Sequence, residues 1–531
     1  MSNFGSVESQ VRVRRRKSRG YAVALLSVSA LALGFAAVSS TDPVDTPAVA
    51  VPSDTALVVG SVSGPLRSYY LQKVTWRDCD ADFQCAKVRV PVSYAKPTKY
   101  GDIQLSIIKR PADDRGRRIG SLLINPGGPG GSGVDYAKAA DMVVSADVLR
   151  RYDLVGFDPR GVASSAPIKC LTDAQLDTML ASDATPDTPA EVNEFRRLSA
   201  VLGNGCLKAA PRLTPRVDTR SAARDMDIIR AVLGDVRMNY LGKSYGTFLG
   251  GTYAQLFPSR VGRFVLDGVV DPKLSNVALS ESQALGFERA IKRFLADCVV
   301  RSDCPFTGTA TQAYRELLDV IDGADQSPLP TGQSGRPLTQ ALLQMGVIYG
   351  MYDATYGWQA ERNALRGVLR GDGSDMLDLV DFFVSRESGA YQDNANEVIA
   401  AVNCIDRQDR PNAYKTGKYA AAWKKKYPMF GEILAWGLLA CEQWPAPAVG
   451  HVGAWRGGKI PPVLVVGTTF DPATVVEGAR NLHKQMPGSR LLEWKGDGHT
   501  AYRQGSSCVD AVVDAFYISG ALPKANKVCR S

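Results

Sequence analysis

A serine lies between two glycines in the segment GKSYG, residues 242–246, directly after an apolar run. This is the G-x-S-x-G pattern, in which the glycines permit a sharp strand-to-helix turn that exposes the serine hydroxyl. A plain glycine-containing loop is the alternative, because five-residue matches arise by chance. Here the pattern follows a strand-like run and opens a helical one, so Ser244 is predicted to be a nucleophile.

A serine hydroxyl needs a base to take its proton, and the chain contains three histidines. His483 lies inside a helical pattern, where a surface position is expected. His451 lies at the end of a long helical segment with no strand beside it. His499 follows the last predicted strand, where a loop can carry the imidazole over the serine. We therefore expect His499 to be the base.

Two aspartates end predicted strands ahead of this histidine. A carboxylate is needed there to orient the imidazole through its second nitrogen. Asp471 ends the strand just before that of His499 and gives the chain order Ser, Asp, His. Asp471 is therefore the predicted acid, and Asp267 is the alternate.

The tetrahedral oxyanion of acyl transfer needs backbone N–H donors aimed at it. The segment INPGGPGGSG, residues 124–133, follows an early strand, and its glycines allow the backbone to approach a ligand closely. A flexible turn is the alternative reading, but two prolines would be unusual in such a turn. We expect the N–H groups of Gly128 and Tyr245 to be the donors.

Strand and helix patterns alternate along the chain around these residues. This alternation predicts an α/β fold with a mostly parallel sheet covered by helices on both faces. The G-x-S-x-G pattern is the strand-to-helix turn of the α/β-hydrolase fold. Strands are predicted at 103–110, 120–127, 152–161, 237–244, 262–270, 461–471 and 490–499, and helices near 134–148 and at 219–234, 245–257, 474–486 and 507–519.

The alternation stops in residues 273–457, where long helical patterns dominate. Because this segment lies between two strands of the alternating region, it is predicted to be a large helical cap inserted into the core. The core then consists of residues 51–272 and 458–531.

The N-terminal segment, residues 1–50, has the features of a secretory signal peptide and leader. A basic cluster precedes an apolar stretch from Tyr21 to about Ser40, and Ala-x-Ala ends at Ala50. An uncleaved membrane anchor is the alternative. We expect export to a secreted or extracytoplasmic location without stable membrane association. The net charge of +9 is concentrated in this cluster, so nucleic-acid binding is not expected.

The ten cysteines fall into close neighbours along the chain, which favours disulfides in an exported protein. Metal binding is the competing reading, but there is no C-x-x-C and no histidine at ligand spacing. No metal and no cofactor are expected. The predicted neighbours are Cys79 with Cys85, Cys170 with Cys206, Cys298 with Cys304, Cys404 with Cys441, and Cys508 with Cys529.

Five motifs in this order resemble those of a known family: the proline-rich glycine loop, GFDPRG, GKSYG, TTFDPAT and GDGHT. They are similar to those of secreted bacterial tripeptidyl aminopeptidases and proline-iminopeptidase-like α/β-hydrolases, over roughly residues 70–529. The resemblance implies a serine exopeptidase that uses Ser244, Asp471 and His499. It would release tripeptides or single residues from free peptide N-termini through an acyl-enzyme.

The same resemblance implies that acidic residues of the cap hold the substrate ammonium. Asp406 and Glu442 are the candidates, since each lies within two residues of a cysteine in a predicted bridge. Two rival functions stay open at this point. One is a secreted carboxylesterase or lipase with the same triad, and the other is a non-catalytic hydrolase fold that binds in the cell envelope.

Overall fold

The structure, a computed structural model, describes residues 58–60, 62–451, 453–457 and 460–530. The predicted signal peptide and leader, residues 1–50, lie outside the described residues. In the part that is described, no helix has the length and apolar character needed to cross a membrane.

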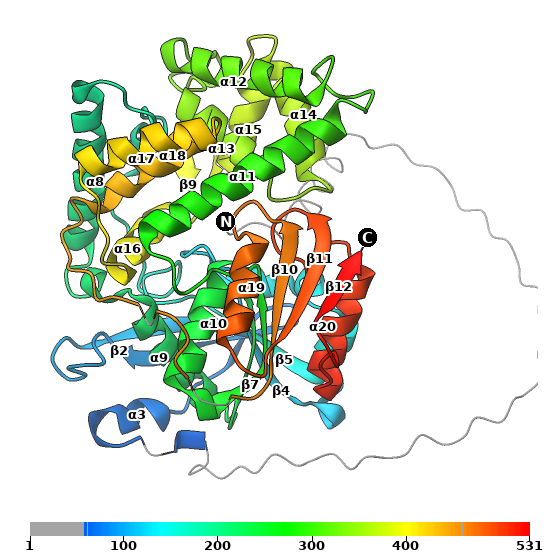
Figure 1. Ribbon diagram of the computed structural model, residues 1–531. Coiled ribbons are helices and arrows are strands. Elements are labelled where there is room, and N and C mark those ends of the chain that lie inside the picture. Colours follow the sequence, from blue (N-terminus) through cyan, green and yellow to red (C-terminus); the bar gives the residue numbers. More distant parts are fainter. Residues whose placement is uncertain (1–57, 61, 452, 458–459, 531) are drawn as a thin grey trace, which may run out of the picture.

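A ten-stranded sheet forms the centre of the described chain (Figure 1). Seven neighbouring strands, β5, β4, β6, β7, β10, β11 and β12, pair in parallel, and β1, β2 and β3 add an antiparallel edge next to β5. The predicted mostly parallel sheet is confirmed, although β1, β2 and β12 were not predicted. In spatial order the strands are β1 (Arg77–Asp80), β2 (Phe83–Pro91), β3 (Asp102–Arg110), β5 (Tyr152–Phe157), β4 (Gly120–Asn125), β6 (Met238–Lys243), β7 (Val261–Asp267), β10 (Val463–Phe470), β11 (Arg490–Asp497) and β12 (Lys527–Arg530).

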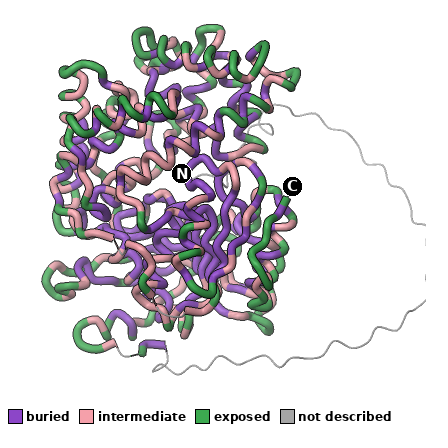
Figure 2. The backbone as a smooth tube through the Cα atoms, viewed as in Figure 1, coloured by how far each residue is buried: buried purple, intermediate pink, exposed green. Residues whose placement is uncertain are grey.

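Helices cover both faces of this sheet, and each face has its own apolar core. In β4, Leu123 belongs to one core while Leu122 and Ile124 belong to the other, as the two-residue period of a strand requires. Both strand faces are buried, which explains why the strand patterns are continuous apolar runs (Figure 2). One face carries α9 (Thr219–Val232), α10 (Tyr245–Leu256) and α19 (Val476–Gln485), and the other carries α4 (Gly133–Lys138), α5 (Ala140–Val143), α6 (Ala146–Arg151) and α20 (Ser507–Ser519).

A layer of helices, here called the cap, lies over the end of the sheet where β10 and β11 terminate (Figure 1). It has a separate apolar core that includes Phe287, Leu317, Leu343 and Leu365. The cap consists of α11 (Asn276–Cys298), α12 (Ala310–Gln326), α13 (Gln340–Gly350), α14 (Gly357–Val368), α15 (Ser374–Phe383), the hairpin β8 (Arg386–Glu387) and β9 (Ala390–Tyr391), α16 (Ala395–Asp406), α17 (Ala413–Lys426) and α18 (Gly431–Trp436).

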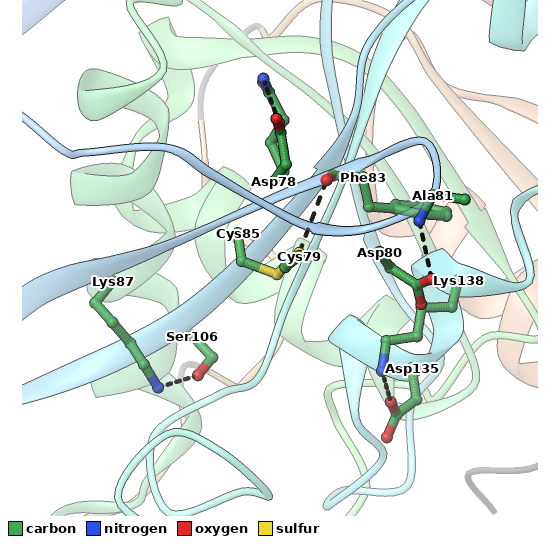
Figure 3. The surroundings of a disulfide bond; sticks show 11 residues. Asp78, Cys79, Asp80, Ala81, Phe83, Cys85, Lys87, Ser106, Asp135 and Lys138 are labelled. Carbon is green, nitrogen blue, oxygen red and sulfur yellow. Dashed lines mark hydrogen bonds and ion pairs between the residues drawn. A yellow bond between two sulfur atoms is a disulfide. The ribbon is translucent and has the colours of Figure 1, made fainter.

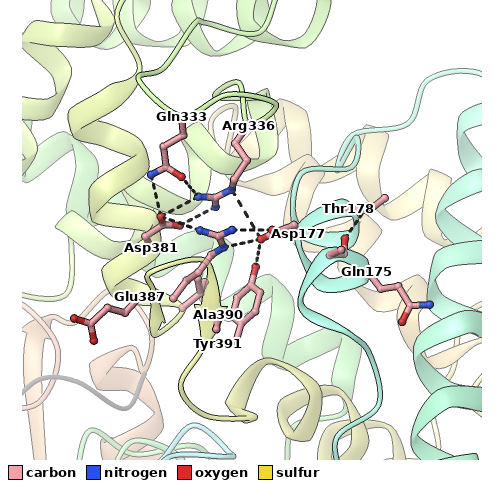
Figure 4. A network of polar contacts seen from close by, with 12 residues as sticks. Gln175, Asp177, Thr178, Gln333, Arg336, Asp381, Glu387, Ala390 and Tyr391 are labelled. Atoms are coloured by element: carbon pink, nitrogen blue, oxygen red, sulfur yellow. Dashed lines mark hydrogen bonds and ion pairs between the residues drawn. The ribbon is translucent and has the colours of Figure 1, made fainter.

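Two helices that were not predicted, α7 (Asp173–Leu180) and α8 (Pro189–Ala209), join the cap from the segment between β5 and α9. Asp177 of α7 forms a bidentate ion pair with Arg386, with N–O distances of 2.8 and 2.9 Å. It also accepts a hydrogen bond from the Tyr391 hydroxyl at 2.8 Å. Arg336 pairs with Asp381 beside them (Figure 4). These charges fasten α7 to the cap.

All ten cysteines form disulfides, and the pairing is the predicted one of nearest neighbours. Figure 3 shows the bond between Cys79 and Cys85, which joins β1 to β2 at the edge of the sheet. Five disulfides in one chain are typical of proteins that fold outside the reducing cytosol.

Glu361 of α14 gives a prediction about stability. Its side chain is fully buried, and neither carboxylate oxygen has a hydrogen-bond partner in the described structure. Burial raises the pKa of this carboxyl well above its usual value of 4.5. The native state therefore holds a proton that the unfolded state loses, and stability falls as pH rises above about 4.5. Glu361→Met should stabilise the fold by about 1–3 kcal/mol at pH 8, measured by urea unfolding.

The matched control is Glu316→Met, which replaces an exposed glutamate of the neighbouring helix α12 and should leave stability unchanged. The pH-dependent fall in stability should also be smaller in Glu361→Met than in the parent protein. A variant that is less stable than the parent at pH 8 would contradict this account of Glu361.

Candidate active site

Ser244 lies at the turn between β6 and α10 with a positive φ of 56°. This conformation is unfavourable for a residue with a side chain, and such residues gather at functional sites. Its N–H donates to the Asp267 carbonyl oxygen at 2.9 Å, which fixes the turn. A Cβ on Gly242 would lie 2.4 Å from the Gly246 carbonyl oxygen, so only glycine fits there. The predicted strand-turn-helix context of Ser244 is present.

His499 lies in the loop after β11, and its ring contacts Asp471 in the loop after β10. Its Nδ1 is 2.9 Å from Oδ1 and 3.0 Å from Oδ2 of that carboxylate. Both side chains are buried. The other ring nitrogen, Nε2, is buried and has no hydrogen-bond partner in the described structure. The imidazole is thus held at one nitrogen and free at the other, which is what a base for a nearby hydroxyl requires.

The Asp471 carboxylate is held by the turn that follows it. It accepts the backbone N–H groups of Ala473 at 3.0 Å and Thr474 at 2.8 Å. The Thr474 hydroxyl donates to Asp471 Oδ2 at 3.0 Å and lies 3.4 Å from His499 Nδ1. Thr474 was not among the predicted site residues. The DPAT motif contains the signal, because an aspartate commonly accepts from N–H groups two or three residues ahead.

The glycine loop after β4 lies directly against the turn at Ser244. A Cβ on Gly127 would come within 2.8 Å of Ser244 Cβ and 3.1 Å of the Tyr245 nitrogen. Gly128 follows with a φ of +110°, which L side chains rarely adopt. Tyr245 is the first residue of α10, where backbone N–H groups lack helical partners. The N–H groups of Gly128 and Tyr245, the two predicted oxyanion donors, thus lie in two segments that contact each other. Gly127 makes this contact, and it was not among the predicted site residues.

Asp267, the alternate acid, is bonded differently. Its carboxylate accepts backbone N–H groups of Ala501 at 2.9 Å and Tyr502 at 2.9 Å. Of the two aspartates that end strands, the structure pairs Asp471 with the His499 ring.

The two candidate anchors for an ammonium group lie in different surroundings. Asp406, at the end of α16, is fully buried and accepts the Thr219 N–H at 2.8 Å and its hydroxyl at 2.5 Å. The same hydroxyl is 2.5 Å from the Tyr245 hydroxyl. Burial raises the pKa of the Asp406 carboxyl to about 7. Glu442 instead forms an ion pair with Arg196 of α8 at 2.7 Å.

The remaining histidines are bonded elsewhere. His451 has Nε2 2.9 Å from the Pro272 carbonyl oxygen and Nδ1 3.3 Å from that of Asp406. His483 has Nδ1 2.8 Å from the Ser489 hydroxyl.

The GFDPRG motif supports the core. Arg160 is almost fully buried, and its guanidinium forms two bonds of 2.7 and 2.6 Å with Asp225 of α9. It also donates to the carbonyl oxygens of Pro91, Val92 and Arg216. The arginine thus fastens the loop after β5 to a helix and a strand.

Comparison with known proteins agrees with this architecture. A sequence profile of the TAP-like protein family matches residues 427–529, which include Asp471 and His499. The chain is 35% identical to serine protease Hip1 of Mycobacterium tuberculosis, over 84% of this chain and 87% of that protein. It is 32% identical to the tripeptidyl aminopeptidase of Streptomyces coelicolor, over 86% of both. The chain belongs to the tripeptidyl aminopeptidase-like α/β-hydrolases.

A third relative of this family bears a different name. Carboxylesterase B of Mycobacterium tuberculosis is 36% identical, over 84% of this chain and 86% of that protein. Membership of the tripeptidyl aminopeptidase-like α/β-hydrolases makes this protein a serine hydrolase and confirms the predicted fold and enzyme class.

Proposed function

We propose that this protein is an exported serine exopeptidase that releases short peptides, tripeptides above all, from free peptide N-termini. The observation that carries the proposal is the contact between the His499 ring and Asp471. Asp267 joins the loop of His499 to the Ser244 turn, since it accepts the N–H groups of both Ser244 and Ala501. The names of two relatives, a serine protease and a tripeptidyl aminopeptidase, support peptides as the substrate class.

In the proposed reaction His499 Nε2 takes the proton from the Ser244 hydroxyl as its oxygen attacks the peptide carbonyl carbon. Asp471 stabilises the imidazolium through Nδ1–H. The backbone N–H groups of Gly128 and Tyr245 bind the oxyanion. The imidazolium then protonates the leaving amine as the C–N bond breaks, which leaves an acyl-enzyme. Water, deprotonated by His499, hydrolyses this ester and restores the serine.

The first test concerns these three side chains. Ser244→Ala, His499→Ala and Asp471→Asn should each lower kcat on a tripeptide anilide by about 10⁴-fold or more, because they act as one unit. Thermal unfolding should show that the variants remain folded. Near-full activity in His499→Ala would exclude this residue as the base. His483→Ala, which removes a histidine bonded to Ser489, is the matched control and should keep parental kcat.

An exopeptidase must recognise a free α-amino group and refuse the interior of a chain. We propose that residues 273–457 form a cap inserted between core segments 51–272 and 458–531 and close the site beyond the first residues. Asp406 is the anchor that we favour within it, because its buried carboxylate connects through Thr219 to Tyr245, next to the nucleophile. Glu442 is the second candidate, but Arg196 already neutralises it.

Free peptides should be cleaved at least about a hundredfold faster than N-acetylated ones, because acetylation removes the charge that the buried carboxylate needs. The pKa of Asp406 is raised to about 7 by burial, and that of a peptide amine lies at about 7.7–8.0. Both groups are therefore charged between about pH 7 and 8. The preference, measured as the ratio of kcat/KM values, should be largest in that interval and decline on either side.

Asp406→Asn should remove most of this preference, whereas Glu442→Gln should leave it largely intact. The opposite result would assign the anchor to Glu442. Equal rates on free and blocked peptides at every pH would reject the exopeptidase proposal.

A carboxylesterase is the second candidate function, favoured by the name of the relative at 36% identity. The same three residues can hydrolyse an ester. Comparing kcat/KM for a tripeptide anilide and a short-chain nitrophenyl ester separates the two, since a carboxylesterase would prefer the ester by a wide margin.

We also propose that the protein acts outside the cytoplasm. Five disulfides and the signal-peptide pattern of residues 1–50 support export.

A further inference from the structure

The loop that carries His499, here called the histidine loop, consists of residues 499–502. Most of its backbone groups have identified partners. The N–H of His499 donates to the Tyr352 carbonyl oxygen at 2.8 Å. The N–H of Thr500 donates to Asp471 at 3.0 Å, and its carbonyl oxygen accepts the Thr468 hydroxyl at 2.6 Å. These bonds fix the first half of the loop.

The second half of the histidine loop is held by two charged side chains that the proposed reaction does not use. Asp267 accepts the N–H of Ala501 at 2.9 and 3.1 Å and that of Tyr502 at 2.9 Å. The Lys243 ammonium donates to the Tyr502 carbonyl oxygen at 2.7 Å. Asp267 is 0% exposed and Lys243 is 7% exposed, so neither bond competes with water.

The same two residues also border the nucleophile. Lys243 directly precedes Ser244, and the Asp267 carbonyl oxygen accepts the Ser244 N–H at 2.9 Å. In the parallel pairing of β6 with β7, Lys243 and Asp267 lie opposite each other at the ends of the strands. Each residue therefore contacts the nucleophile turn through its backbone and the histidine loop through its side chain.

We propose that Lys243 and Asp267 are positioning residues that set the placement of His499 relative to Ser244. The inference rests on the proposed function, in which His499 is the base for Ser244. The bonds to the histidine loop go to backbone atoms, so they fix where the loop lies whatever side chains it carries.

The opposite charges of Lys243 and Asp267 explain why two ionisable side chains can be buried between the Ser244 turn and the histidine loop. Burial raises the pKa of Asp267 and lowers that of Lys243, and each charge opposes the shift of the other. Buried N–H groups without an acceptor are unfavourable, so apolar residues here would release the loop. A carboxylate can accept both N–H groups, whereas a carboxamide has one acceptor oxygen and adds two donors.

The test measures Asp267→Asn in two backgrounds. In the parent protein this change should lower kcat on a tripeptide anilide by about 10- to 100-fold, because small misplacements of a catalytic group have effects of that size. KM should change less than about twofold. In the His499→Ala background the same change should have no further effect on residual kcat, since a positioning role requires the imidazole.

Asp235→Asn is the matched control, because this aspartate lies before β6 at the opposite end of the strand and accepts the Ser121 N–H. It should keep parental kcat. If Asp267→Asn does not fold, as judged by thermal unfolding, Lys243→Met replaces it with the same expectations in both backgrounds.

Parental kcat in a folded Asp267→Asn, or an equal loss of kcat with and without His499, would overturn the positioning role. Failure of the proposed function would give a different result: the single variant His499→Ala, with Asp267 unchanged, would keep its activity.

Discussion

The strained backbone at Ser244 is the constraint on which the rest of the site depends. A positive φ at a residue with a side chain is unfavourable, and it persists only where the surroundings enforce it. Here the enforcement comes from close packing. Gly242 contacts the helix that begins after the serine, and Gly127 brings the glycine loop against Ser244 Cβ. These contacts leave no room for a Cβ, so the glycines beside Ser244 follow from its geometry.

Much of the fold and of the candidate site could be predicted, because both depend on short-range patterns. Continuous apolar runs between helical segments identified the strands of the parallel sheet, apart from the short strand β12. In such a sheet the loops after the strands meet at one edge, so Ser244, Asp471 and His499 were expected there. In the structure the His499 ring contacts the Asp471 carboxylate. Strand β1 escaped because all four of its residues are exposed. Strand β2 escaped because buried and exposed residues alternate along it, unlike the continuous apolar runs of the other strands.

Side-chain partners distant in sequence could not be predicted in the same way. Asp267 and Asp471 both end predicted strands, and only their positions along the chain relative to Ser244 and His499 favoured Asp471. That the Asp267 carboxylate binds the backbone of residues 501 and 502 had no local signal. Glu442 lies next to a disulfide as expected, but its partner Arg196 comes from α8, a helix that was not predicted. Such an ion pair depends on how α8 and the segment that carries Glu442 pack together in the folded protein.

The cap contacts the loop that carries His499. The carbonyl oxygen of Tyr352, in the segment after α13, accepts the His499 N–H at 2.8 Å, and its ring lies edge-on to the imidazole with centroids 5.1 Å apart. Relatives with names as different as serine protease and carboxylesterase belong to this family. A triad can attack either an ester or an amide, so the difference between such enzymes must arise outside it. Because the segment after α13 contacts both the backbone and the ring of His499, the cap and the candidate site do not vary independently of each other.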